Sequence, residues 1–450
     1  MSGPGNSIWF GKYAFQDRQY RTALECFMEA EEKEPGFDSA NGIGLCLTEM
    51  DQDAGALEWF NKAYARMSEE MLACQANRAK SLAGVGREQE ALDLYNGILR
   101  FRDVPFLRYS RGLVYLQAGS YEEAIADFNK VLETEPTNDL ARFGRGFAYL
   151  VLGHYAQGFS DYECRLKDDL KGPDVPLWTG TEDLTGKTIL VHGEMGLGDN
   201  IMFMRYVPML LARGAKRVVV VVPESQYPIV PKLEGITYTS ADHATWPKLD
   251  YWIRFMSLAY AFRTTAETVP PPVSPELYGH EVRRFNDVVK TTRPGSLKIG
   301  LCWSGNPKSK YDAWRNVPLA KLAPLFDIPG TQFYSLQKGI RESDREAFAN
   351  LPIIDLDPYI KDFGDTSHAM YAMDLMITVD TSVAHMAGTV GIPTWVMLTT
   401  FRTYWLWISR LATSPWYPSV RVFRQPKDGD WDSVVETIRK NIMTKLIKAA

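Results

Sequence analysis

The sequence predicts an array of helix pairs followed by a two-lobed α/β region. Two observations predict this architecture. A motif repeats every 33 to 35 residues over the first third of the chain, and apolar strands alternate with amphipathic helices beyond it. At 450 residues, the chain has room for roughly two to four domains. We place the repeats at 1–166, the two lobes at 167–293 and 294–425, and a last helix at 426–450.

The repeat consists of a small residue followed four positions later by an aromatic residue. The pairs are Ala23/Phe27, Ala56/Phe60, Ala91/Tyr95, Ala124/Phe128 and Gly158/Tyr162. They are 33, 35, 33 and 34 positions apart, which is the period of tetratricopeptide repeats. Small residues let helices cross closely, and the aromatic ring fills the gap between neighbouring units. Five such units build a continuous core and a concave groove. Pro35 and Pro136 lie where the second helix of a unit should end.

The region after the repeats has the alternation that is typical of parallel sheets. A connector rich in Pro, Gly and Asp begins at Lys167. The first lobe should contain strands at 187–192, 217–223 and 249–254, and helices at 201–212 and 279–291. The second lobe should contain strands at 297–303, 331–337, 375–379 and 394–398, and a last helix at 431–447.

The composition is that of an ordinary globular protein, with 45% hydrophobic and 23% charged residues. The net charge of −5 gives no global basic field for nucleic acid or an anionic membrane. The start, MSGPGNSIWF, lacks the features of a signal peptide, and the longest apolar run, Val218–Pro223, is too short to span a bilayer. The five cysteines form no CxxC pair. We therefore expect a cytoplasmic protein without disulfides or a zinc site.

One candidate anion site lies in Ile377–Pro393, ITVDTSVAHMAGTVGIP. The segment reads as a strand, a turn at Asp380, and a helix that opens with small residues. The backbone N–H groups of Thr381, Ser382 and Val383, at the positive end of the helix dipole, favour a phosphate. The alternative is an ordinary helix cap, made by Asp380 or Thr381, that binds nothing.

A second candidate site is the glycine turn after the first strand of the first lobe. Gly193, Gly196 and Gly198 should let the backbone approach a ligand closely and take positive φ angles. Their spacing is GxxGxG rather than the dinucleotide fingerprint GxGxxG, and no acidic residue ends a following strand at the expected place. This pattern argues against NAD.

Five motifs in order resemble a known family. They are GEMGLGDNIMFMRY, GLCWSGNP, SLQ, DLMITVDTSVAHMAGTVGIPTWVML and SPWYPSVRVFRQ. Together, over roughly Tyr162 to Trp431, they resemble the catalytic half of bacterial tetratricopeptide-repeat glycosyltransferases. Those enzymes are related to the ADP-heptose:lipopolysaccharide heptosyltransferases and have the GT-B fold of two Rossmann-like lobes. The resemblance implies an inverting hexosyl- or heptosyl-type transferase, with the acceptor at the first lobe and the nucleotide sugar at the second. It also implies that the last helix packs back on the first lobe.

The resemblance also suggests roles for single residues. Asp199 matches the carboxylate that deprotonates the acceptor, although aspartate is equally suited to cap the helix beginning at Asn200. Glu194, in the same turn, is a weaker rival for the base. Arg315 matches a position that is usually basic, and we expect it to contact the donor.

Further donor contacts are expected where strands of the second lobe end. Lys338 is placed to neutralise a diphosphate, and Gln337 to recognise a base or ribose. Ser304 and Asn306 suit contact with phosphate or sugar. His385 either reaches a phosphate or is a helix-surface histidine without a ligand.

We expect no cofactor and no metal. The one DxD pattern considered, Asp355–Asp357, is followed by proline and reads as a solvated loop. The aromatic stretch 403–417 either shapes a sugar pocket or packs against the last helix. The expected partners are a nucleotide-sugar donor and an acceptor protein or glycan held by the repeat groove. The rival hypotheses are a non-catalytic repeat scaffold with a degenerate α/β half, and a transferase that adds sugar to DNA or a glycan.

Overall fold

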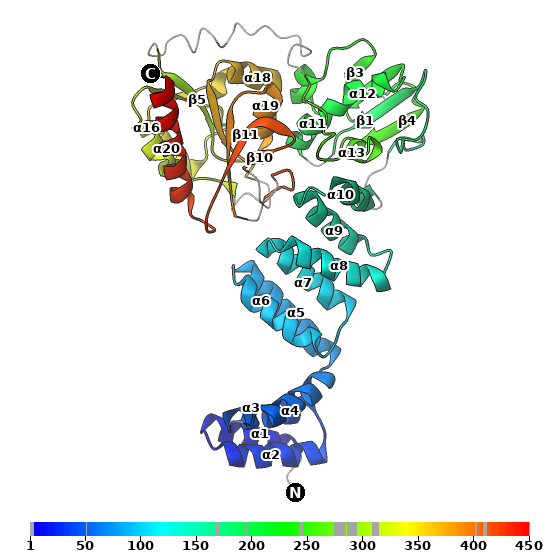
Figure 1. The fold of residues 1–450 in the computed structure, drawn as a ribbon, viewed down its shortest axis with the longest axis vertical. Helices are drawn as coiled ribbons and strands as arrows, with labels where there is room; N and C mark the ends of the chain where they lie inside the picture. The colour runs from blue at the N-terminus through cyan, green and yellow to red at the C-terminus, as the bar shows by residue number, and fades with distance from the viewer. Residues whose placement is uncertain are drawn as a thin grey trace. The chain divides into compact units, whose positions relative to one another are not determined.

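The computed structural model describes most of the chain as two compact units, Met1–Arg145 and Gly146–Ala450 (Figure 1). The described residues are 4–50, 52–166, 172–194, 196–242, 246–273, 285, 295–307, 315–400, 403–407 and 412–449. The helix expected at 279–291 falls in a stretch of which only Phe285 is described. The predicted domain boundary at 293/294 also lies outside the described residues, as does Lys167 at the boundary 166/167.

The first unit is an array of antiparallel helix pairs (Figure 1). Its helices are α1 (Pro4–Gln16), α2 (Tyr20–Lys33), α3 (Phe37–Glu49), α4 (Asp53–Ala65), α5 (Glu69–Gly84), α6 (Glu88–Leu99), α7 (Pro105–Ala118), α8 (Tyr121–Thr134) and the first part of α9 (Asp139–Val151). Helices α2 and α8 end just before Pro35 and Pro136, as the sequence predicts.

The predicted packing of aromatic rings against small residues is confirmed. The ring of Phe128 lies between Gly112 of α7 and Gly144 of α9, where a Cβ atom on either glycine would come within 2.7 Å of it. Phe27 fills the same kind of gap against Gly42, at 2.5 Å from the position of such a Cβ. Glycine at these positions therefore lets helices of neighbouring repeats approach each other across a buried ring.

The second unit begins with the last helix pair and continues into a parallel sheet. After α9 come α10 (Tyr155–Tyr162) and the 3₁₀ turn η1 (Glu163–Leu166). The sheet has the order β3-β2-β1-β4, with every neighbouring pair parallel. Its elements are β1 (Thr188–His192), α11 (Leu197–Phe203), α12 (Val207–Ala212), β2 (Arg217–Val221), β3 (Ile236–Thr239), β4 (Tyr251–Arg254) and α13 (Ser257–Ala261).

A second sheet has the order β10-β11-β9-β8-β5-β6-β7 and is parallel except at the β10 edge. Its strands are β5 (Leu297–Cys302), β6 (Thr331–Ser335), β7 (Ile353–Asp355), β8 (Leu375–Val379), β9 (Thr394–Leu398), β10 (Thr413–Ser414) and β11 (Tyr417–Arg424). Its helices include α16 (Ala323–Phe326), α17 (Arg345–Asn350), α18 (Phe363–Tyr371) and α19 (Ser382–Val390). The predicted fold class, a helical repeat array followed by two Rossmann-like lobes, is confirmed.

The last helix, α20 (Trp431–Ala449), packs on the second sheet. Its apolar face, with Trp431, Val434 and Ile438, joins the same core as Ile299 of β5 and Leu325 of α16. The sequence-based expectation that this helix returns to the first lobe is therefore wrong. The helix follows β11 directly and covers the apolar face of its own sheet.

Within the described part of the chain, no helix combines the length and the apolar character needed to cross a bilayer.

Candidate functional site

Each sheet has one point where the strand order reverses, and several of the predicted site residues lie in the loops at these two points. In the first sheet the chain leaves β1 toward β2 and returns to β4 on the other side of β1. In the second it leaves β5 toward β6 and returns to β8 on the other side of β5. Loops that diverge at such a reversal leave a crevice at the carboxyl ends of the strands, where open α/β sheets bind ligands.

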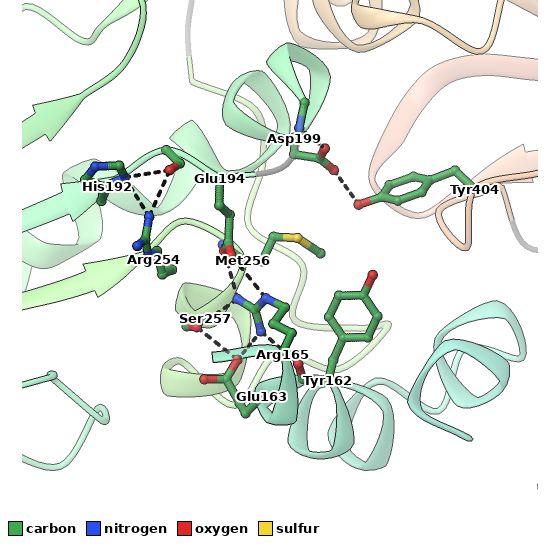
Figure 2. A network of polar contacts seen from close by, with 12 residues as sticks. Tyr162, Glu163, Arg165, His192, Glu194, Asp199, Arg254, Met256, Ser257 and Tyr404 are labelled. Carbon is green, nitrogen blue, oxygen red and sulfur yellow. Dashed lines mark hydrogen bonds and ion pairs between the residues drawn. The ribbon is translucent and has the colours of Figure 1, made fainter. Parts of the chain in front are cut away.

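Asp199 lies at the reversal point of the first sheet and is held from two sides (Figure 2). It is the third residue of α11, and its Oδ2 accepts a hydrogen bond from the Gly196 N–H at 2.9 Å, so it caps its own helix. Its Oδ1 accepts a hydrogen bond from the hydroxyl of Tyr404, which follows β9 in the second lobe. The sequence-based expectation that Asp199 is the N-cap of a helix beginning at Asn200 is therefore wrong in its position, because the helix begins at Leu197 and Asp199 reaches back from its first turn to the N-cap backbone. Asp199 also faces the second lobe.

The surroundings of Asp199 make its carboxylate more basic. Burial raises the pKa of Asp199 to about 6, and the nearby charges of Glu194 and Asp380 also raise it. The hydrogen bonds from Tyr404 and Gly196 oppose this rise. A carboxylate with such a pKa is ionised at neutral pH and accepts a proton more readily than an ordinary aspartate.

Glu194, the rival base, is committed to an ion pair in the first lobe (Figure 2). Arg165 of η1 donates to it through Nε at 3.1 Å and Nη2 at 2.8 Å, and the Met256 N–H donates at 2.9 Å. The two charged side chains are only 7% and 4% exposed. Arg165 also pairs with Glu163, so this network fastens the last helical turn of the repeats to the loops after β1 and β4.

The glycine turn is shaped by close packing and not by positive φ angles. Gly196 has a φ of −112°, and neither Gly193 nor Gly198 is among the glycines with positive φ, so that part of the expectation is wrong. A Cβ atom on Gly198 would lie 2.5 Å from the ring of His385. Gly193 pairs with β2 through its N–H. The absent side chain at 198 thus lets α11 pack directly on α19.

His385 is buried in this contact and does not lie on the helix surface. It is 5% exposed, its Nδ1 lies 3.2 Å from the Tyr417 hydroxyl, and the Tyr404 and Trp407 rings also pack on it. Burial, together with the charge of Arg205, lowers the pKa of His385 to about 3. The imidazole is therefore neutral at physiological pH.

The turn after β8 leaves helix α19 with open N–H groups. Thr381 is the N-cap residue, yet its side chain makes no capping hydrogen bond. Ser382 and Val383 have no acceptor for their N–H groups among the residues that the structure describes. Two unsatisfied donors at the positive end of a nine-residue helix form the geometry that favours an anion.

Arg315 lies between the loops after β5 and β8. Its Nη1 donates to the Asp380 carbonyl at 3.2 Å, and its Nη2 lies 2.4 Å from where a Cβ on Gly305 would be. Its Nε is buried without a hydrogen-bond partner in the described structure. Burial raises the pKa of the Asp380 carboxyl group, and the charge of Arg315 is among the effects that oppose this rise. The predicted basic residue is thus at the reversal point of the second sheet.

The loop after β5 contributes Ser304, which is buried and whose Oγ has no partner among the described residues. Its N–H donates to Oε1 of Gln337 at 3.0 Å. Gln337 therefore ties the ends of β5 and β6 together, and this oxygen is not directed at a base or ribose. Asn306 is exposed beyond this turn.

Lys338 points away from the turn at Asp380. Its Nζ lies 2.5 Å from Oδ1 of Asp357 and donates to the Ile360 carbonyl at 2.8 Å, while the side chain is 67% exposed. Asp357, from the DxD pattern, is therefore occupied by a lysine and by the Gly339 N–H. The described residues contain no cluster of three or more His, Cys, Asp or Glu side chains able to hold a metal ion.

The described residues of the aromatic stretch after β9 pack on the first lobe and on the last repeat, whereas the sequence analysis expected either a sugar pocket or the last helix. Trp405 and Trp416 are fully buried against Tyr155 and Phe159 of α10. The Trp416 Nε1–H donates to the Tyr155 hydroxyl at 3.0 Å, and Phe203 of α11 packs edge-on against Trp416. Sequence reasoning singled out this stretch but missed Tyr404 within it, and it missed Arg165. No spacing rule links either residue to its partner.

Comparison with known proteins identifies the repeats. Residues 10–70 match the family model "Tetratricopeptide repeat" and residues 112–153 match "TPR repeat". Over 465 aligned positions the chain is 26% identical to Protein FlbA of Caulobacter vibrioides, an alignment that covers 94% of this chain and 75% of FlbA.

Two solved structures are similar to part of the chain. The glycosyl transferase family 9 protein from Veillonella parvula aligns with 60% of this chain and 99% of its own, at 12% identity and a TM-score of 0.44. The ADP-heptose lps heptosyltransferase II of E. coli aligns with 58% of this chain and 99% of its own, at 14% identity and the same TM-score. Similarity at this level says nothing about activity.

Proposed function

We propose that this protein is a glycosyltransferase that moves a sugar from a nucleotide donor to an acceptor hydroxyl or other nucleophile. The donor binds the second lobe and the acceptor is activated from the first. One observation carries the proposal. The basic carboxylate of Asp199 is hydrogen-bonded to Tyr404 of the lobe that carries the open helix start at Ser382 and Val383. A proton acceptor and an anion site thus belong to two lobes that are in direct contact.

The leaving group in this reaction is a nucleotide, and its growing negative charge needs stabilisation. The N–H groups of Ser382 and Val383 supply two donors, and the guanidinium of Arg315 supplies a positive charge beside them. The buried hydroxyl of Ser304 is a further donor without a partner in the described structure. These groups support a metal-independent transfer in which Asp199 takes the acceptor proton. Inversion at the sugar is what the resemblance to the heptosyltransferases implies.

The repeats hold the acceptor in this proposal. Stacked helix pairs present an extended groove, which suits a protein better than a small molecule. An acceptor protein, such as a surface or flagellar protein, fits this arrangement. The rival hypothesis is a scaffold that binds partners through the repeats and has lost catalysis. No observation favours the rival over a site whose base and anion donors are both intact.

Thermal unfolding with a panel of UDP, GDP, ADP and CMP compounds tests the donor site. One nucleotide should raise the melting temperature of the wild type. Ser382→Pro should lose most of that shift, because proline is accepted at the first helical position but removes one N–H aimed at the phosphate. The extended backbone at Thr381 (φ −142°, ψ 175°) tolerates a following proline.

Ser382→Ala is the matched control, since it removes the hydroxyl and keeps the N–H. A wild-type protein that responds to none of the nucleotides would favour the scaffold. An equal shift in melting temperature for both variants and the wild type would show that the phosphate does not bind at the start of α19.

A further inference from the structure

Both oxygens of Asp199 are occupied, and each is held by a different lobe. The Gly196 N–H holds Oδ2 within the first lobe, and the Tyr404 hydroxyl holds Oδ1 from the second (Figure 2). Burial and the charge of Asp199 raise the pKa of Tyr404 far above 10. The phenol therefore stays protonated and acts as the donor in this pair.

Tyr404 lies beside a buried aromatic cluster. Its neighbour Trp405 is fully buried, with its ring 5.5 Å from that of Phe159 and 5.4 Å from that of Trp416. The ring of Tyr404 also packs edge-on against His385 of α19, with the ring centroids 6.4 Å apart. Tyr404 thus contacts the proposed base through its hydroxyl and the helix of the proposed donor turn through its ring.

We propose that Tyr404 is a positioning residue whose hydroxyl keeps Asp199 ionised and oriented toward the second lobe. Through this contact the lobe that binds the donor sets the reactivity of the base in the other lobe. The assignment rests on the proposed function, because it gives Asp199 the role of a base.

The groups around Asp199 set the direction of the expected change. Glu194, from the loop after β1, and Asp380, from the loop after β8, carry charges that disfavour its ionised form. His385 of α19 is neutral, and the Tyr417 hydroxyl of β11 faces that imidazole. Tyr404 supplies the largest stabilisation of the ionised form. Removing its hydroxyl leaves the Gly196 N–H to oppose burial and the two negative charges, so the pKa of Asp199 rises above 6.

The test measures the titration of Asp199 in the full chain without any substrate. A water-soluble carbodiimide with a small amine couples to protonated carboxyl groups, and peptide mass spectrometry follows labelling at Asp199 across pH 4.5–8. In Tyr404→Phe the midpoint should move up by about one pH unit, a tenfold change in the protonated fraction at a given pH. Tyr260→Phe, which removes the hydroxyl of an exposed tyrosine on α13, should leave the midpoint where it is.

A graded variant covers the case in which Tyr404→Phe disturbs the fold. Tyr404→3,5-difluorotyrosine keeps the ring and hydroxyl but donates more strongly, so the midpoint should move down. An unchanged midpoint in both variants would overturn the assignment of Tyr404. The effect on activity is read separately. If Asp199→Asn consumed sugar nucleotides as fast as the wild type, the proposed base would be wrong, while the labelling would still report whether Tyr404 controls the titration.

Discussion

Asp199 satisfies two requirements that the sequence presents as alternatives. Its backbone position makes it a capping residue of α11, and one oxygen is enough for that purpose. The second oxygen faces the other lobe, where it accepts a hydrogen bond from the Tyr404 hydroxyl. A cap and a base are therefore compatible in one carboxylate, and the sequence could not reveal this, because Tyr404 lies 205 positions away.

The pH dependence of turnover tests the proposed role of Asp199. A base must be ionised, and its pKa is about 6, so turnover should rise with pH through about 6 and level off above it. Asp199→Asn should bind the donor normally and lose at least about a hundredfold in turnover. Initial rates and donor titrations measure both. Near-normal turnover in Asp199→Asn would show that Asp199 caps α11 and does not act as the base.

The two basic side chains predicted at the donor site should differ in effect. Arg315 contacts the turn at Asp380, whereas Lys338 is paired with Asp357. Arg315→Gln should therefore weaken nucleotide binding by about tenfold or more, since it removes a charged hydrogen-bond donor. Lys338→Ala should weaken it much less, as measured by isothermal titration. If Lys338→Ala weakened nucleotide binding more than Arg315→Gln, the diphosphate would bind at the loop after β6 and not at the turn at Asp380.

At the scale of elements, the sequence predicts the strands well. It predicts poorly the side-chain contacts that join one element to another. The seven strands expected from apolar runs all form, with ends shifted by at most about two residues. β3, β7 and the β10–β11 hairpin were not predicted, because they are short or carry mixed polar residues. The ion pair between η1 and the glycine turn depends on a contact across 29 positions that no pattern encodes.

The buried pair of Arg165 and Glu194 should be important for stability. Arg165→Met leaves the buried Glu194 carboxylate without its ion-pair partner, and breaking a buried pair in this way typically costs about 3–5 kcal/mol. Urea unfolding followed by tryptophan fluorescence measures the loss. Lys130→Met, which breaks an exposed pair with Glu133 in the other unit, is the matched control and should change stability by less than about 1 kcal/mol. Equal effects of the two changes would show that the network contributes little.

Acid should destabilise the contact between α11 and α19. The folded pKa of His385 is about 3 and its unfolded value about 6.5, so the unfolded state binds more protons between these values. The contribution of His385 to stability is complete above pH 6.5 and is lost as the pH falls toward 3. By pH 4 the loss due to His385 alone should approach about 3 kcal/mol, while protonation of Asp199, whose folded pKa is raised to about 6, acts in the opposite direction. His385→Asn should flatten this dependence in urea unfolding at several pH values, whereas an unchanged slope would contradict the assigned burial.

At the scale of the whole molecule, the fold class and the repeat period follow from the sequence alone. Small and aromatic residues recur at a fixed period along the chain. This period indicates helix pairs, because each unit must bury an aromatic ring at the corresponding position. The limits of the compact units do not follow from that period. The last repeat matches the other repeats in sequence, yet its α10 packs into the core of the second unit through Tyr155 and Phe159. Its aromatic partners come from a loop more than 200 positions later, which the repeat pattern does not include.

This division predicts where the chain can be cut. A fragment beginning at Asn138, which keeps α9 and α10 whole, should fold and bind the nucleotide with unchanged affinity. A fragment beginning at Thr188 should be much less stable, because it lacks both Arg165 and the aromatic partners of Trp416. Circular dichroism and nucleotide titration compare the two. The Asn138 fragment should also lose most activity on a protein acceptor, and full activity would exclude the first repeats from acceptor binding.

The proposal that both lobes cooperate in sugar transfer is tested most directly by donor consumption. The full chain, wild type or Asp199→Asn, is incubated with a panel of sugar nucleotides and an extract containing acceptor proteins, and the released nucleotide is measured by chromatography. The wild type should release the nucleotide from one donor of the panel, unaffected by EDTA, and Asp199→Asn should release it at least about a hundredfold more slowly. Release from no donor, or equal release by both proteins, would contradict the proposal.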